Sequence, residues 1–376
     1  MAERKDSKLK DLWFGTQIVS SIVPGIILAV AIMLAAIFFT DKIGTVLPFK
    51  KNPLSPILVA IILGLIIANS IRLPKMLGPG IKFGVAKLLR FGIILMGIRL
   101  AITDILKIGS LAVFFVAICV TAAIAITLFV AKKIGIGEKL GTLIAAGTSI
   151  CGVSAIVATA PAIEAEEEET AYAVATITIF GLLATVIYPY LTELVLHLPV
   201  ESAGFFIGTA VNDTSQVTGT AMIYDQLWGH STASGLVGSD IAITTKLVRN
   251  TFMLAVIPFL GFWFAKKTAK KIRGQKIQVR KYVPLFVLGY VLMGIVRTAG
   301  DGLFGSGVHW VATHNLIRQS AEYIIAVAIA CVGLNTDAKR LAKLGYKPFL
   351  GGLAASFAVG MVSWLLVMLF GSYLRF

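Results

Sequence analysis

The sequence predicts an all-α integral membrane protein with about 11 transmembrane helices, inverted repeats and two broken or discontinuous polar helices. Its composition is 57% hydrophobic and 14% charged, with a mean hydropathy of +0.88, whereas soluble domains carry about 25% charged residues. Apolar runs near the ~20 residues that a helix needs to cross a bilayer recur along the chain. These runs are continuously apolar and do not alternate, which excludes the strands of a membrane barrel.

Short polar gaps separate eleven predicted spans. The spans are 22–40, 54–71, 81–98, 110–131, 140–162, 170–195, 203–223, 238–264, 283–299, 319–335 and 348–371. Residues 1–20 mix basic side chains with Trp13 and Phe14, so they are predicted to form a cytoplasmic interfacial segment. The first apolar run is longer than the ~7–15 residues of a signal core, so we expect it to be retained. Residues 21–376 then form one transmembrane transporter domain.

The basic residues predict the orientation of the chain in the membrane. With the N-terminus inside, and with Lys82, Lys87 and Arg297 near span ends counted with the adjacent loops, 23 Lys and Arg fall on the inner side, 8 fall on the outer side, and 3 lie within spans. Inner loops are the basic ones, so the prediction is a multi-pass cell-membrane protein with a cytoplasmic N-terminus and an outer C-terminus. We therefore interpret the net charge of +15 as a determinant of membrane orientation and of contact with lipid, and not as a sign of nucleic-acid binding. Leu196–Ser202 has no Lys or Arg, so 140–162 and 203–223 are left open as full crossings or re-entrant segments.

Two internal similarities predict repeats. MGIRLAITDILKIG (Met96–Gly109) resembles VGLNTDAKRLAKLG (Val332–Gly345), and the predicted topology places these copies in opposite orientations, as in many secondary transporters. GTSICGVSAIVATA (Gly147–Ala160) resembles GTAVNDTSQVTGTA (Gly208–Ala221). The second pair is rich in Gly, Ser and Thr, which suits either close helix packing or an unwound stretch that lines a cavity. We expect both segments to be broken and to meet near the membrane centre, where free backbone N–H groups can bind an anion.

Ionisable residues inside spans are costly, so each is a functional hypothesis. Arg90, Lys246 and Arg249 supply three positive charges at depth, and Asp213 supplies one negative charge. Lys246 and Arg249 are three residues apart and share one helix face. The surplus of positive charge predicts a site for a small anion, although Arg90 or Lys246 can also reach an interface or a carbonyl group.

Other chemistry finds little support in the sequence. The three cysteines, Cys119, Cys151 and Cys331, lie far apart inside apolar runs, and the four histidines lie in loops without ligand spacing. The chain has no phosphate-binding loop and no HExxH or GxSxG motif. We therefore expect no metal, no cofactor and no enzyme activity.

Three motifs resemble those of the YeiH family, which is named for sulfate export. The first is Gly147–Ala155, the second is NDTSQV beginning at Asn212, and the third is the K-x-x-R of Lys246 and Arg249. The family usually has His at the position of Asn212, which weakens any proton relay there. The resemblance covers the chain from about residue 20 onward. It implies a fold distantly like that of the sodium/proton antiporters and bile acid symporters, with inverted repeats and broken helices, and it is compatible with a homodimer.

These observations favour a secondary transporter, in the export direction, for a small inorganic or organosulfur anion such as sulfate or sulfite. A cation/proton antiporter that uses Asp213 is the alternative, and a membrane-embedded enzyme with Cys151 as nucleophile is a third hypothesis. A proton or sodium ion could couple the transport. The predicted substrate-binding residues, with Arg90 as a further charge partner, are Ser149, Cys151, Gly152, Ser154, Asn212, Asp213, Thr214, Ser215, Gln216, Lys246 and Arg249. Arg249 is predicted to be the principal anion contact.

Overall fold

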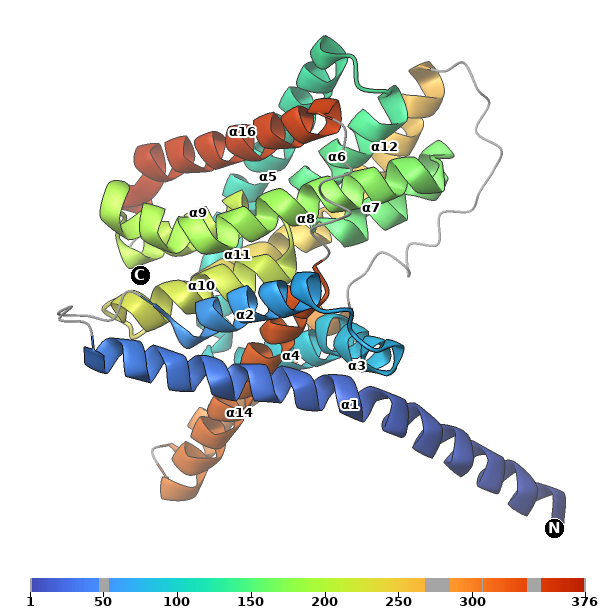
Figure 1. Cartoon of the computed structure of the whole chain (residues 1–376). Coiled ribbons are helices and arrows are strands. Elements are labelled where there is room, and N and C mark those ends of the chain that lie inside the picture. Colours follow the sequence, from blue (N-terminus) through green and yellow to red (C-terminus); the bar gives the residue numbers. More distant parts are fainter. Residues whose placement is uncertain (1, 47–53, 268–284, 306, 337–345, 375–376) are drawn as a thin grey trace. The chain divides into compact units, whose positions relative to one another are not determined.

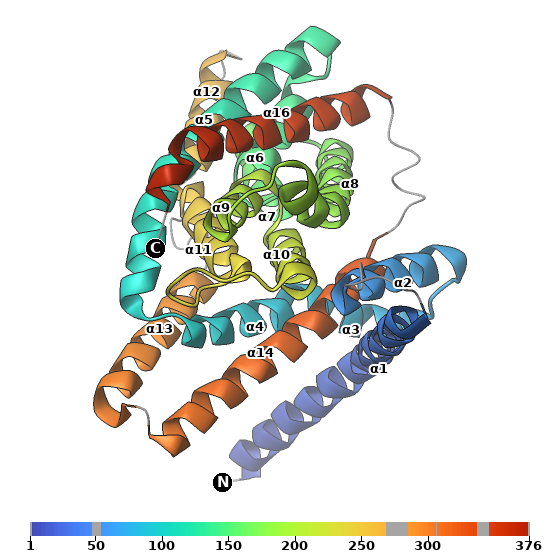
Figure 2. The ribbon, with the colours of Figure 1, turned by 90° about the vertical axis from the view of Figure 1, so that its left-hand side faces the viewer.

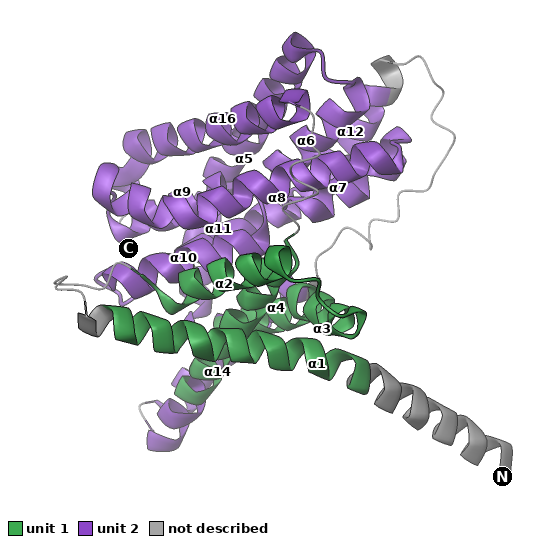
Figure 3. Ribbon diagram, viewed as in Figure 1, with its two compact units in different colours: residues 1–96, 315–338 green, residues 97–314, 339–376 purple. Residues whose placement is uncertain are grey.

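The computed structural model is built of helices throughout the part of the chain that it describes, residues 2–46, 54–267, 285–305, 307–336 and 346–374 (Figure 1). The chain divides into two compact units (Figure 3). Unit 1 comprises residues 1–96 and 315–338, and unit 2 comprises residues 97–314 and 339–376. The single transporter domain predicted over 21–376 stays a prediction.

Unit 1 contains α1 (Ala2–Val46), α2 (Pro56–Ser70), α3 (Gly78–Phe83), α4 (Leu89–Met96) and the second part of α14 (Val308–Leu334). A 3-10 turn (Lys75–Leu77) precedes α3, and a π-helical turn (Gly84–Leu88) joins α3 to α4. A Cβ atom on Gly80 would lie 2.1 Å from the Ile22 carbonyl oxygen, so the absence of a side chain lets α1 and α3 approach backbone to backbone. The helix α1 continues without a break from the predicted interfacial segment into the first span.

Six helices among the described residues are long and apolar enough to cross a membrane. They lie in α1, α5 (Ile102–Ile134), α8 (Glu167–Tyr190, extended by a π-helical turn, Leu191–Val195), α13 (Leu285–Phe304), α14 and α16 (Tyr346–Phe370, followed by a 3-10 turn, Gly371–Tyr373). The bent pair α11 (Gly238–Thr251) and α12 (Met253–Lys267), whose axes differ by 41°, passes the same test when its two helices are taken together, either as a broken span or as a re-entrant loop. The membrane character predicted from composition is thus supported.

The two polar segments of unit 2 are broken where the sequence predicted. The helix α6 (Glu138–Ser149) ends before Ile150, and α7 (Val153–Thr159, continued by a 3-10 turn, Ala160–Ile163) begins after Gly152. The helix α9 (Val200–Ala210) ends before Val211, and α10 (Thr214–Trp228) begins after Asp213. Both breaks fall at the same place in the internal repeat, because the two helix ends that border the second break, Ala210 and Thr214, each lie 61 residues after their counterparts, Ser149 and Val153.

The segment α6–α7 is a helical hairpin. A Cβ atom on Gly147 would lie 2.8 Å from Ile156, nine residues later, so the chain doubles back. Leu143 of α6 and Ile163 after α7 belong to one hydrophobic cluster with Ala173 near the start of α8. Each arm is also short, since twelve residues of α6 span only about 18 Å.

The segment α9–α10 is a second hairpin that enters from the other end of α8. Gly204 near the start of α9 and Tyr224 near the end of α10 both pack against Gly238, although a straight helix would separate them by about 30 Å. The Trp228 indole donates to the Pro189 carbonyl oxygen at the end of α8 (3.1 Å). Figure 2 shows α9, α10 and α11 as neighbours.

Each of the predicted spans 140–162 and 203–223 folds back on itself, and the count of about eleven transmembrane helices stays a prediction. If neither segment crosses the membrane, two loops of the predicted topology change sides. The count of basic residues on each side stays at 23 and 8, because the loops that change sides (163–169 and 196–202) contain no Lys or Arg. Most of the repeat copy Val332–Gly345 lies outside the described residues, so the inversion predicted from it stays a prediction.

Candidate functional site

The two hairpin tips meet inside unit 2. Gly152 in the first tip has φ +67° and ψ −122°, a conformation that side-chain-bearing residues rarely adopt. A Cβ atom there would lie 2.9 Å from Oδ2 and 3.0 Å from Cβ of Asp213 in the second tip. Glycine is therefore required both by the turn and by the contact between the tips.

Arg249 of α11 joins the two tips and is fully buried. Its Nε donates to the Ser149 carbonyl oxygen (2.8 Å), and a terminal nitrogen donates to the Thr148 carbonyl oxygen. The other terminal nitrogen donates to the carbonyl oxygens of Thr209 (2.8 Å) and Val211 (3.0 Å) in the second tip. The guanidinium thus neutralises the carbonyl ends of α6 and α9, where the helix dipole is negative.

Lys246 lies one turn earlier on the same face of α11 and is also fully buried. Its Nζ donates to the carbonyl oxygens of Ile150 (2.8 Å), Val211 (3.0 Å) and Asn212. A buried ammonium group requires such partners because the loss of water is otherwise costly. Lys246 and Arg249, with the carbonyl groups that they bind, are called the carbonyl clamp below.

The carbonyl clamp follows the internal repeat. Thr148 and Thr209 are equivalent in the two copies, and Arg249 binds both of their carbonyl oxygens. Ile150 and Val211 are likewise equivalent, and Lys246 binds both. One turn of α11 therefore binds matching backbone groups of both hairpins.

Asp213 lies at the N-terminus of α10, whereas the carbonyl clamp binds the C-terminal ends of α6 and α9. Its Oδ1 caps α10 by accepting from the Ser215 backbone N–H (2.9 Å) and the Ser215 hydroxyl (2.6 Å). Its backbone N–H donates to Gln216 Oε1 (3.1 Å), which completes a capping box. Gln216 Nε2 donates to the Thr178 carbonyl oxygen on α8 (3.3 Å). The equivalent of Asp213 in the first copy is Gly152, so no side chain caps α7.

The amide side chains tie the second tip to neighbouring helices. Asn212 donates to the Ser356 hydroxyl of α16 (3.2 Å), and Asn250 of α11 donates to the Thr214 hydroxyl (3.2 Å). The second polar atom of each amide is buried without a hydrogen-bond partner among the described residues. The Thr245 hydroxyl of α11 is in the same state. Buried polar atoms are rarely left unpaired, so these groups retain capacity for a ligand or water.

The first tip offers a different surface. Ser154, the second residue of α7, is exposed, whereas Ser149 and Cys151 are buried. The Ser149 hydroxyl donates to the Ala146 carbonyl oxygen (3.2 Å) and thus to its own helix. The Cys151 thiol lies 3.3 Å from the Met253 sulfur, a thioether that cannot act as the base a nucleophilic cysteine requires.

Most of the predicted site is brought together. Eleven of the predicted residues belong to the two tips and the carbonyl clamp. Arg90 belongs to unit 1, where it lies in α4 with an exposed side chain. The role of Arg90 as a charge partner therefore stays a prediction. The predicted cavity between the two tips, lined by their polar side chains, also stays a prediction.

Sequence reasoning missed the groups that face the cations most directly. These are backbone carbonyl groups of Thr148, Thr209 and Val211, which have no side-chain signature. It also missed Gly181 of α8, where a Cβ atom would lie 1.8 Å from Gln216 Oε1. The matched Thr148 and Thr209 of the repeat were the one available signal for the carbonyl groups.

Together the fold and site define a helical, multi-pass membrane protein in which two opposed re-entrant hairpins are joined by buried cations. Residues 24–366 match the family described as conserved hypothetical protein 698. The chain belongs to this family, the YeiH or UPF0324 family of membrane proteins, as its motifs indicated.

Curated relatives agree over nearly their whole length. A UPF0324 membrane protein of Fusobacterium nucleatum is 30% identical over 332 residues, which cover 86% of this chain and 92% of the relative. A UPF0324 membrane protein of Bacillus cereus is 32% identical over 347 residues, which cover 92% and 94%. No solved structure matches the chain.

Proposed function

We propose that this protein is a secondary transporter that moves a small anion by alternating access, with its substrate site at the meeting hairpin tips. The observation that carries the proposal is the pair of opposed hairpins, whose four helix ends and buried charges converge at one place in unit 2. Discontinuous helices that meet in mid-membrane are typical of substrate sites in secondary transporters.

The charge balance favours an anion. Lys246 and Arg249 contribute two positive charges and Asp213 one negative charge. The two carbonyl ends and the two N-terminal ends carry about half a charge each, and their opposite signs cancel. A surplus of about one positive charge remains at the tips, and a small anion would neutralise it.

The exposed side of the tips carries Ser154, with Asp213 and Thr214 partly exposed beside it. We place the substrate there, where the uncapped first turn of α7 can donate backbone hydrogen bonds to an oxyanion such as sulfate or sulfite. Arg249 attracts the anion through its charge. A direct contact would require it to exchange at least one of its four carbonyl partners.

The alternative, a cation/proton antiporter that uses Asp213, has one specific observation in its favour. The unpaired polar atoms of Asn212 and Asn250 are carbonyl oxygens as the amides are oriented, and such oxygens bind sodium. Against it, the Lys246 ammonium group donates to the backbone carbonyl oxygen of Asn212, so a cation bound at the Asn212 side chain would face a like charge at short range.

The hairpins also support a proposal for the orientation of the chain in the membrane and for the symmetry between the two repeat copies. Since they enter from opposite ends of α8 and share one pattern of breaks, we propose that they are inverted copies. With the basic loops inside, the N-terminus is cytoplasmic and the C-terminus lies outside a cell membrane. We further propose that transport runs in the export direction, that the protein forms a homodimer and that an ion is coupled to transport. The proposal assigns no catalytic step to Cys151.

The test is a panel of ions on the purified full-length chain in detergent, read by thermal unfolding. An ion that binds the folded state and is present at 100 times its Kd adds about 2.7 kcal/mol of stability. We expect sulfate, sulfite or a small organosulfonate to raise the unfolding temperature, with chloride as the anion control. The same ions should exchange across proteoliposomes that contain the wild-type protein.

Asp213→Asn is the discriminating variant. It removes the one negative charge at the tips, so anion binding should tighten while release slows. Protection by sodium or lithium alone, abolished by Asp213→Asn, would establish the cation alternative and reject the anion.

A further inference from the structure

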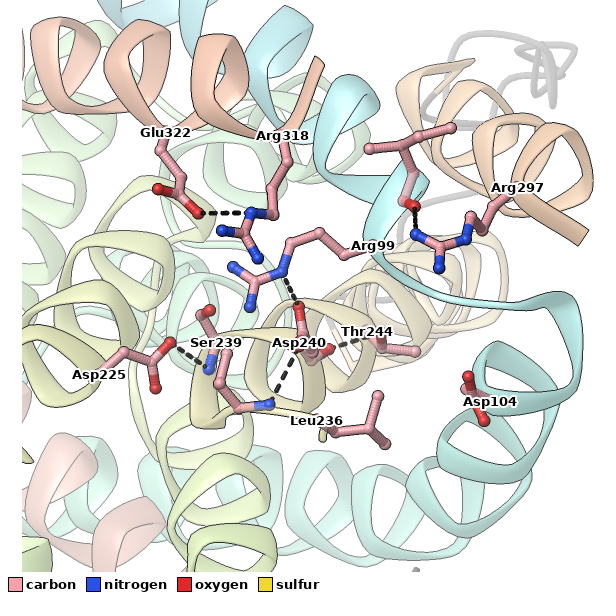
Figure 4. A network of polar contacts seen from close by, with 12 residues as sticks. Arg99, Asp104, Asp225, Leu236, Ser239, Asp240, Thr244, Arg297, Arg318 and Glu322 are labelled. Atoms are coloured by element: carbon pink, nitrogen blue, oxygen red, sulfur yellow. Dashed lines mark hydrogen bonds and ion pairs between the residues drawn. The ribbon is translucent and has the colours of Figure 1, made fainter. Parts of the chain in front are cut away.

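A second cluster of ionisable groups lies at the base of the α9–α10 hairpin, apart from the tips. Asp225 is near the end of α10, Ser239 and Asp240 are in the first turn of α11, and Arg99 closes the 3-10 turn Gly97–Arg99 (Figure 4). All four belong to unit 2. The base is where the hairpin is attached to the clamp-bearing helix.

The two carboxylates of this cluster are unequally satisfied. Asp240 is paired with Arg99 (Oδ1 to Nε, 3.0 Å), and its Oδ2 accepts from the Val237 backbone N–H (3.1 Å). Asp225 makes no ion pair within the described residues, and its Oδ2 accepts only the Ser239 backbone N–H (3.1 Å). One arginine therefore stands near two carboxylates, and the ion pair that it forms is with Asp240.

Two atoms here are buried and unsatisfied. Asp225 Oδ1 is enclosed and has no hydrogen-bond partner in the described part of the chain, and the Ser239 hydroxyl is in the same state. Ser239 is 1% exposed and faces the Asp225 carboxyl group. A buried carboxylate without an ion pair is strongly disfavoured in its ionised form, even with the Ser239 hydroxyl as a donor, whereas a protonated one can donate from Oδ1 to that hydroxyl.

We propose that Asp225 binds the proton that is coupled to transport. This inference rests on the proposed transporter function. Protonation leaves one negative charge, on Asp240, opposite one positive charge, on Arg99, so the buried cluster becomes neutral. Loss of the proton adds a second negative charge beside Asp240, which repels Asp225 and weakens the contact between α10 and α11. The bound proton therefore favours the arrangement in which α10 packs against α11 at the base of the hairpin.

Further titratable groups lie beside the cluster. His230, in the loop after α10, lies 2.9 Å from Glu193 Oε1, and the Tyr224 hydroxyl donates to Glu193 Oε2 (3.4 Å). Tyr224 is the neighbour of Asp225 in the chain. The charged or titratable groups that face the cluster are Arg99, Glu193, Glu201, Tyr224, His230, Asp240 and Tyr290.

The direct test is infrared difference spectroscopy of the full-length protein in lipid, recorded while pH is changed. We expect the C=O band of a protonated carboxylic acid in the wild type and its loss in Asp225→Asn. Asp301→Asn is the matched control, because Asp301 is an exposed carboxylate paired with Arg297 (2.7 Å); it should leave the band unchanged. A wild type without the band, or a band that persists in Asp225→Asn, would overturn the proposal.

Asp240→Asn provides a second measurement if Asp225→Asn does not fold. It removes the neighbouring negative charge and frees Arg99 for Asp225, so the proton affinity should fall at least tenfold. A titration midpoint that stays in place would also reject the inference. If the band behaves as expected but no ion crosses proteoliposomes, the proton site stands and the transporter function fails.

Discussion

At the scale of single residues, the hairpin tips depend on groups without ordinary side-chain partners. Arg249 and Lys246 are held by backbone carbonyl oxygens, and neither forms an ion pair with a carboxylate within the described part of the chain. The sequence could predict that these cations and Asp213 lie together, because ionisable residues are rare at such depth. It could not predict what the cations bind, because any residue supplies a carbonyl group and only the turn decides where that group points.

Arg249→Ala should lower the free energy of unfolding by about 3 kcal/mol, since four carbonyl contacts lose a charged donor. Arg249→Lys keeps the charge but cannot reach both tips, so it should weaken anion binding more than tenfold. The matched control is Arg318→Ala, which removes a half-exposed pair with Glu322 at 3.8 Å and should cost under about 1 kcal/mol. Thermal unfolding and anion binding measure both effects. Equal stability of the two alanine variants would contradict the structural role of Arg249.

Gly152→Ala should separate the tips, because its φ is +67° and the new Cβ would meet Asp213 at 2.9 Å. Gly229→Ala is the control: its φ is +66° and nothing lies within 4 Å of the added atom. We expect flux in proteoliposomes to fall at least tenfold for Gly152→Ala and to stay within twofold for Gly229→Ala. Normal flux in the first variant would show that the contact between the tips is dispensable.

At the scale of elements, hydropathy identified every apolar helix but could not tell a crossing from a hairpin. The predicted spans 140–162 and 203–223 have the right length and composition, yet each folds back at a three-residue break. Their polar, glycine-rich sequences predicted the breaks. The direction after each break is set by the conformations of Gly152 and Asp213 and by the carbonyl clamp, which are tertiary features. The absence of Lys and Arg from 196–202 was the one hint.

Single cysteines can test the hairpins, because the three native cysteines are buried. Gly137→Cys and Glu166→Cys flank α6–α7, so a membrane-impermeant maleimide should label both from the same side of the membrane. Pro199→Cys and His230→Cys flank α9–α10 and should both be labelled from the opposite side. Labelling of Gly137→Cys and Glu166→Cys from different sides would restore the full crossing.

At the scale of the whole molecule, composition and basic loops predicted a multi-pass membrane protein, and family membership agrees. The division into two units was not predictable, because unit 1 combines residues 1–96 with residues 315–338. Such a division depends on which distant helices pack together, as where Gly64 of α2 meets the Ala330 carbonyl oxygen of α14. No composition change marks that boundary.

A reporter fused to each end of the chain tests the proposed orientation. A cytoplasmic reporter should be active at the N-terminus and inactive at the C-terminus, because two hairpins remove two crossings and leave the parity unchanged. Activity at both ends would place the C-terminus inside and contradict the proposal.

The matched carbonyl groups under Lys246 and Arg249 also restrict how this gene can vary. After a duplication one copy is usually free to diverge, but here both copies serve the same two cations through backbone atoms. Substitutions leave a carbonyl group in place, whereas an insertion or deletion moves it. Apart from Gly152, the two tips should therefore tolerate changes of residue identity better than changes of length, and both turns should keep three residues wherever the K-x-x-R pair is kept.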